Sequence, residues 1–157
     1  MNNLSDELQM GKAGEHLVCF DLILQGYNAF LSDQGLPYDV VLDHGNKLWT
    51  IQVRTTSALS NVYGNCRYRF QNRMGRAGKS RQSVDAIADF YAFVALDIKT
   101  IAYIYSKDIL GKDGCMLQTI DFKSKAAEYQ YAPRKTDGYI PKCRGKFLQD
   151  YVIFPSK

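Results

Sequence analysis

The chain has 157 residues and a net charge of +4, and hydrophobic residues make up 46% of it. A chain of this size and composition can bury one hydrophobic core, which argues against an intrinsically disordered protein. Its four cysteines are far apart and only two histidines accompany them, so neither a zinc knuckle nor a disulfide framework is expected. Without a signal peptide or a membrane-spanning apolar run, we expect a soluble cytoplasmic protein with no membrane contact.

A helix is predicted over residues 5–24, and Gly26 is suited to end it in a left-handed conformation. Apolar residues at spacings of three and four predict its buried stripe: Met10, Ala13, Leu17, Phe20 and Leu24. Glu15 flanks this stripe, in a position from which a carboxylate can face a cleft. Gly11 and Gly14 would let another backbone or a phosphate approach the helix closely.

Three strands are predicted to follow the helix, at residues 27–31, 39–43 and 47–54. A Gly-Asn pair at 45–46 indicates a hairpin between the second and the third of these strands. Side chains alternate between the faces of a strand, so Gln52 and Arg54 share one face. Asp39, on the neighbouring strand, can reach that face.

The rest of the chain predicts short elements at 66–70, 80–87, 90–96, 101–105 and 106–110, with a flexible basic loop over 71–79. The order of helices and strands predicts an α/β protein with a mixed central β-sheet flanked by helices. We expect a single domain over residues 1–157, with a core at about 5–110 and a basic C-terminal extension at about 129–157.

Positive charge is concentrated in residues 44–84, which hold eight basic residues and no acidic one; the remainder holds twelve basic and sixteen acidic residues. A solvated basic loop is the simpler interpretation. However, six of the eight are arginines, whose planar fork suits phosphate oxygens and guanine edges, and aromatic residues lie between them. We therefore expect a nucleic-acid surface formed by Arg67, Arg69, Arg73, Arg76, Lys79 and Arg81.

Two carboxylates, Glu15 and Asp39, are candidates for binding a divalent cation. Hydrolysis of a phosphodiester needs an activated water, neutralised phosphoryl oxygens and a stabilised leaving group, and Mg²⁺ can serve all three. The amide oxygen of Gln52 and a backbone carbonyl at Gln52 or Val53 can add ligands, while Arg54 faces the phosphate. Taken singly, each residue also has an ordinary interpretation, as a surface carboxylate, a turn cap or an exposed cation paired with Asp39.

The ordered set resembles the PD-(D/E)xK nuclease superfamily, in particular the branch of group I intron-encoded homing endonucleases and their bacterial relatives. That superfamily has a Glu on a first helix, an Asp after a proline-containing turn, and an acid-x-Lys triplet on the next strand. The homing branch carries Gln in the acidic slot, within a Gln-Val-Lys-Thr run. Residues 51–56, IQVRTT, match that run except that Arg54 replaces lysine. The similarity covers roughly residues 10–110.

The resemblance implies a restriction endonuclease-like core in which Glu15, Asp39, Gln52 and Arg54 take the active-site positions. Mg²⁺, or Mn²⁺, would be held by Glu15, Asp39, Gln52 and Val53. It implies a metal-dependent endonuclease of bacterial or phage type that hydrolyses duplex DNA as a homo-oligomer, a dimer or a tetramer.

Two departures from the family pattern keep other functions open. Gln52 removes one negative charge, which weakens Mg²⁺ binding, and Arg54 stays protonated, which prevents it from acting as a general base. A Holliday junction resolvase or a restriction or repair nuclease would share the same core. A catalytically impaired nucleic-acid-binding protein that kept the fold is the alternative from a different class.

Overall fold

The computed structural model describes residues 6–33, 35–62, 65–72, 88–111, 114, 116–117, 119–123 and 147–155, without the side chains of 61–62 and 65–66. The chain begins its described part with the helix α1 (Asp6–Leu24). The strands are β1 (Asn28–Leu31), β2 (Val40–Asp43), β3 (Leu48–Thr56), β4 (Ser60–Val62), β5 (Asn65–Gln71), β6 (Phe90–Ala95), β7 (Thr100–Tyr105) and β8 (Thr119–Lys123). Two 3-10 helices are also described, η2 (Ser106–Ile109) and η4 (Leu148–Tyr151).

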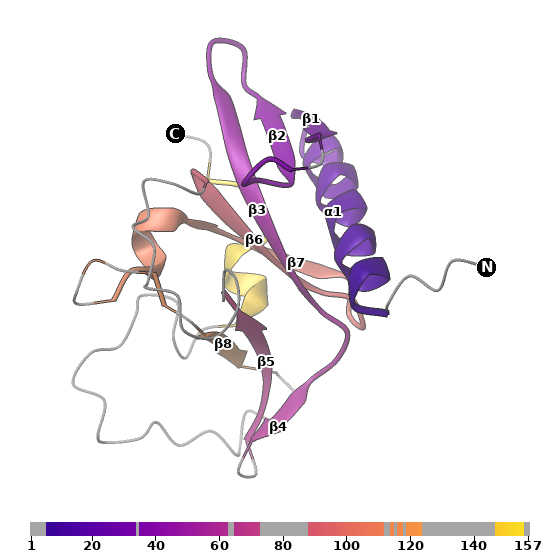
Figure 1. Ribbon diagram of the computed structural model, residues 1–157, viewed down its shortest axis with the longest axis vertical. Helices are drawn as coiled ribbons and strands as arrows, with labels where there is room; N and C mark the ends of the chain where they lie inside the picture. Colours follow the sequence, from indigo (N-terminus) through magenta and orange to yellow (C-terminus); the bar gives the residue numbers. More distant parts are fainter. Residues whose placement is uncertain are drawn as a thin grey trace.

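The larger sheet has the strand order β1-β2-β3-β6-β7 (Figure 1). Neighbouring strands pair antiparallel except β3 and β6, which are parallel. A parallel pair needs a long crossover connection, and the segment between β3 and β6 contains β4 and β5. Gly45, at φ 73°, closes the predicted hairpin between β2 and β3. The predicted class, an α/β domain with a mixed central sheet, is confirmed.

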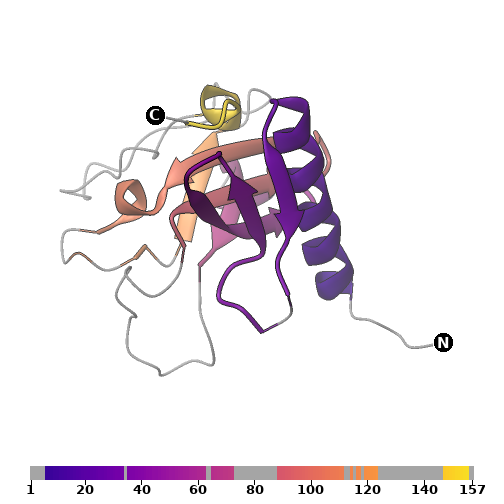
Figure 2. The same cartoon turned by 90° about the horizontal axis from the view of Figure 1, so that it is seen from above.

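One face of this sheet is covered by α1, which runs along it in Figure 2. The helix buries Gly14, Val18 and Leu22. The predicted stripe is wrong, because two of its members, Phe20 and Leu24, are 59% and 70% exposed. Apolar residues stand on several sides of this helix, so spacing alone does not select a face. Packing selects it instead, and the helix turns Gly14 toward β3.

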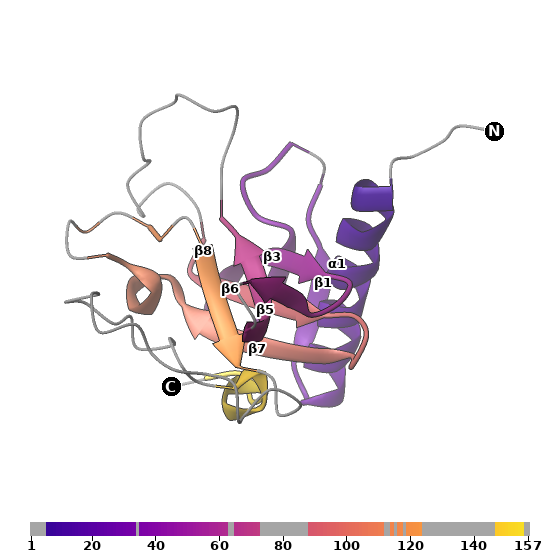
Figure 3. The ribbon, with the colours of Figure 1, turned by 90° about the horizontal axis from the view of Figure 1, so that it is seen from below.

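The other face of the larger sheet packs against β5, β8 and η4 (Figure 3). Aromatic side chains form this second core, among them Phe70, Tyr91, Phe93 and Phe122. The smaller sheet has the order β4-β5-β8, and its strand β5 confirms the strand predicted at 66–70. The sequence analysis missed β4, β8 and η4. In β8 only Ile120 and Phe122 are apolar, too few to distinguish a strand from a loop.

The last described segment, 147–155, packs on both cores. Leu148 belongs to one core and Phe154 to the other. The side chain of Gln25 donates to the Val152 carbonyl at 2.9 Å and accepts from the Phe154 N–H at 2.9 Å. This end of the predicted C-terminal extension is therefore part of the folded core.

Several expectations fall outside the described residues. They are the helix at 80–87, most of the extension at 129–157, and Arg73, Arg76, Lys79 and Arg81. Within the described part of the chain, no helix is both long and apolar enough to cross a membrane.

Two glycines of α1 give a matched test of how the helix is seated. A Cβ at Gly14 would overlap the Thr55 side chain of β3, whereas a Cβ at Gly11 would meet nothing within 4 Å. We expect Gly14→Ala to lower the free energy of unfolding by about 1–3 kcal/mol, through overpacking. Gly11→Ala should raise it by up to about 1 kcal/mol, because alanine is the better helix former. Denaturant unfolding measures both, and equal effects would contradict this seating of the helix.

Candidate active site

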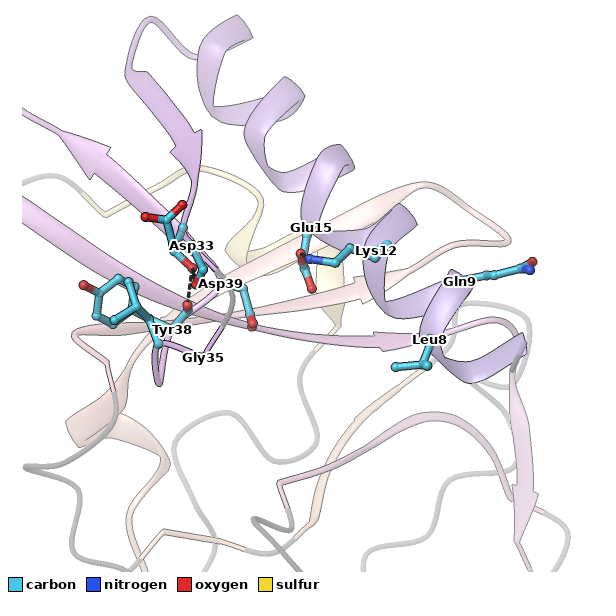
Figure 4. Close-up of a pocket in the computed structure, with 10 residues that line it drawn as sticks. Leu8, Gln9, Lys12, Glu15, Asp33, Gly35, Tyr38 and Asp39 are labelled. Carbon is cyan, nitrogen blue, oxygen red and sulfur yellow. Dashed lines mark hydrogen bonds and ion pairs between the residues drawn. The ribbon is translucent and has the colours of Figure 1, made fainter. Parts of the chain in front are cut away.

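A cavity of about 720 Å³ lies between α1 and the loop that leads into β2. Lys12 and Glu15 line it from the helix, and Asp39 lines it from the loop. Figure 4 shows the Glu15 and Asp39 side chains extending into the cavity from these two walls. The structure thus brings together the two carboxylates that the sequence singled out.

Asp39 is fixed by three interactions where β2 separates from β3. Its N–H donates to the Ile51 carbonyl at 2.9 Å, beside the last pair of the β2–β3 ladder. Beyond that point Asp39 Oδ2 accepts from the Val53 N–H at 2.7 Å and from Gln52 Nε2 at 2.5 Å. The carboxylate therefore accepts the hydrogen bond of the Val53 N–H, which has no backbone partner on β2 beyond the end of the ladder. This confirms that Asp39 reaches the strand face bearing Gln52.

The environment of Asp39 acts on its charge in opposite directions. Burial raises the pKa of the Asp39 carboxyl group, the Val53 N–H lowers it, and the negative charge of Glu15 raises it again, while the positive charges of Arg54 and Lys12 lower it. The net result is a raised pKa. The two carboxylates are close enough to repel each other, and a cation between them would relieve that repulsion.

Lys12 is a cation in the cavity that the sequence analysis missed. Its Nζ lies 2.6 Å from Glu15 Oε2, and this bond raises the pKa of the Lys12 ammonium. The lysine side chain is 53% exposed and that of Glu15 is 14% exposed. The i,i+3 spacing of the two residues on a helix is the signal that would have indicated the pair.

Arg54 lies on the predicted face of β3 but turns back onto its own strand. Its Nη1 donates to the Val53 carbonyl at 3.1 Å, the backbone group expected to ligate a metal. No ion pair joins Arg54 to Asp39 among the described side chains. The guanidinium therefore stands beside the site and blocks one lone pair of a candidate ligand.

The oxygen donors of this site fit a hard divalent cation. Among the described residues, no group of three or more His, Cys, Asp or Glu side chains is placed to hold a metal. The carboxylates of Glu15 and Asp39 line the cavity. The amide oxygen of Gln52 and the carbonyl of Val53 belong to the two residues that bond to Asp39. Mg²⁺ prefers oxygen ligands, with one or two carboxylates and several waters. These four residues are the ones that would hold it.

The described part of the basic segment carries less free charge than its sequence suggests. On β5, Arg69 Nε lies 2.9 Å from Asp121 Oδ1 and Arg67 Nη1 lies 3.0 Å from Asp121 Oδ2. One carboxylate from β8 thus neutralises half of the charge of this pair. Contact of Arg67 and Arg69 with DNA remains a prediction.

No protein-family model matches the chain, and a search of the curated proteins finds no match. Among solved structures, the chain is similar to a bacterial homing endonuclease, I-Ssp6803I, with a TM-score of 0.57 and 16% sequence identity. The similarity covers 83% of this chain and 84% of that chain. The chain therefore has a homing-endonuclease-like fold. At this identity the likeness concerns the fold alone, and the chemistry depends on the site.

Proposed function

We propose that the protein is a metal-dependent endonuclease that hydrolyses phosphodiester bonds of duplex DNA. The observation that carries the proposal is the half-buried Asp39 carboxylate, held by Gln52 and Val53 and repelled by Glu15 across one cavity. Two carboxylates that line one cavity, of which Glu15 is bonded to the exposed and flexible Lys12, are suited to a divalent cation. The fold shared with a homing endonuclease supports a nucleic-acid substrate.

Bound Mg²⁺ would supply an activated water and neutralise the phosphoryl oxygens. The chain's own residues have separate tasks. Asp39 presents its carboxylate in a fixed orientation, because two donors already hold Oδ2. Lys12 neutralises Glu15 in the free protein and, once released, can contact the phosphate as a flexible point charge. Arg54 adds a permanent positive charge that would stabilise the negative charge developing on the phosphoryl oxygens.

A junction resolvase or a restriction or repair nuclease would use the same residues, and a panel of linear, branched and supercoiled DNA distinguishes these substrates. We also propose a homo-oligomer, because cutting both strands of a duplex needs two sites and each chain supplies one. A binding protein without catalysis is the alternative, favoured by the Arg54 contact with the Val53 carbonyl.

DNA cleavage by matched aspartate variants tests the proposal. Asp39→Asn removes the charge in the cavity, whereas Asp43→Asn removes one at the far end of β2, where Asp43 accepts from the Gly45 N–H. With Mg²⁺ or Mn²⁺, we expect Asp39→Asn to cleave supercoiled plasmid at least about 100-fold more slowly, since even outer-shell changes cost 10–100-fold. Asp43→Asn should cleave like the wild type. A wild type that cuts no DNA in the panel would favour the binding protein.

Asp121 gives a separate test of the DNA surface. Asp121→Asn frees the charges of Arg67 and Arg69 while keeping the shape of the side chain. If the two arginines bind phosphates, the variant should bind duplex DNA more tightly and its affinity should fall more steeply with salt. The slope of log affinity against log salt should grow by up to about one for each additional phosphate that the variant neutralises. Fluorescence anisotropy over a salt series measures it, and an unchanged slope would exclude these arginines from the surface.

A further inference from the structure

Two buried polar atoms beside the candidate site have no hydrogen-bond partner among the described residues: the hydroxyl of Tyr91 and Nε of Arg54. Tyr91 is fully buried. Buried polar groups are almost always paired, because an unpaired one loses its bonds to water without replacement. Three further buried side-chain atoms are also unpaired among the described residues: Thr55 Oγ1, Arg67 Nε and Asn72 Oδ1. The Tyr91 hydroxyl and Arg54 Nε differ from these because one can accept the hydrogen bond that the other donates.

The strand register places both atoms on the face that carries Gln52. β3 and β6 pair in parallel, with Gln52 opposite Tyr91 and Arg54 opposite Phe93. Side chains alternate along both strands, so Tyr91 shares the face of Gln52 and Arg54. The charges of Arg54 and Asp39 both influence the Tyr91 hydroxyl, which is consistent with this placement. The pKa of Tyr91 is raised to about 12, chiefly by burial, while Arg54 lowers it and Asp39 raises it.

The chemistry of the three groups is complementary. The guanidinium can only donate, an ionised carboxylate can only accept, and a phenol hydroxyl can do both at once. Tyr91 can therefore accept from Arg54 Nε and donate to Asp39. In the free protein the guanidinium is occupied with the Val53 carbonyl at 3.1 Å. When that carbonyl is used by another group, the guanidinium needs a new acceptor, and the Tyr91 oxygen lies on the same face of the sheet.

We propose that Tyr91 is a positioning residue of the site: its hydroxyl links Arg54 to Asp39 when DNA is bound and so aims the guanidinium at the phosphate. The inference rests on the proposed nuclease function. Tyr91 is fully buried, so its hydroxyl would act through Arg54 and Asp39.

Tyr91→Phe tests the proposal, with Tyr103→Phe as the matched control. Tyr91→Phe should lower kcat at least about tenfold with little change in KM, because a bond to a charged group is lost. Its melting temperature should stay the same or rise, since an unpaired buried hydroxyl is removed. The Tyr103 hydroxyl donates to Asp21 at 2.7 Å, so Tyr103→Phe should lose stability and keep kcat. An unchanged kcat in Tyr91→Phe would overturn the proposal.

A double-mutant cycle shows whether Tyr91 acts through Arg54. Lysine has no Nε–H on a planar fork, so in an Arg54→Lys background Tyr91→Phe should change kcat less than about twofold. An equal loss in both backgrounds overturns the link to Arg54.

An NMR measurement keeps the inference separate from the nuclease function. If neither the wild type nor Asp39→Asn cleaves DNA, the proposed function fails. The ¹⁵N signal of Arg54 Nε is then followed as a DNA duplex is added. A shift in the wild type that is lost in Tyr91→Phe supports the positioning role. Identical signals in the two proteins overturn it.

Discussion

The site depends on the Asp39 carboxylate, which accepts a backbone hydrogen bond from β3 where the neighbouring strand β2 no longer pairs with it. The β2–β3 ladder ends at Val40 and Ile51, and the Val53 N–H would then face no partner. Asp39 Oδ2 accepts that bond and a second one from Gln52. These donors offset part of the cost of half-burying the charge and hold the carboxylate in a fixed position in the wall of the cavity. Seating α1 on Thr55 through Gly14 then brings Glu15 toward it.

Sequence reasoning succeeded where the controlling interactions are local. Period-two alternation along β3 and the turn at Gly45 were enough to place Asp39 beside Gln52. It failed on the buried face of α1, because the contact that selects this face joins Gly14 to Thr55, far along the chain. η4 was missed for the same reason, since its segment is held by Gln25 at the other end of the chain.

Charge counting along the sequence also has a physical limit. The acid-free stretch 44–84 has a local excess of eight positive charges. In the fold, Asp121 comes from outside this stretch and binds two of its arginines. The field near β5 is therefore weaker than the sequence suggests. Conversely, Lys12 lies outside the stretch and adds a cation next to Glu15, inside the cavity.

We propose that Glu15 and Asp39 form one divalent-cation site. Calorimetric titration with Ca²⁺, which binds oxygen ligands without supporting hydrolysis, tests it most directly. The wild type should bind Ca²⁺, and Glu15→Gln and Asp39→Asn should each weaken binding at least about tenfold, since each removes a charged ligand. Asp43→Asn should bind like the wild type. If the wild type binds no Ca²⁺, or if Glu15→Gln and Asp39→Asn each bind it like the wild type, Glu15 and Asp39 do not form a divalent-cation site.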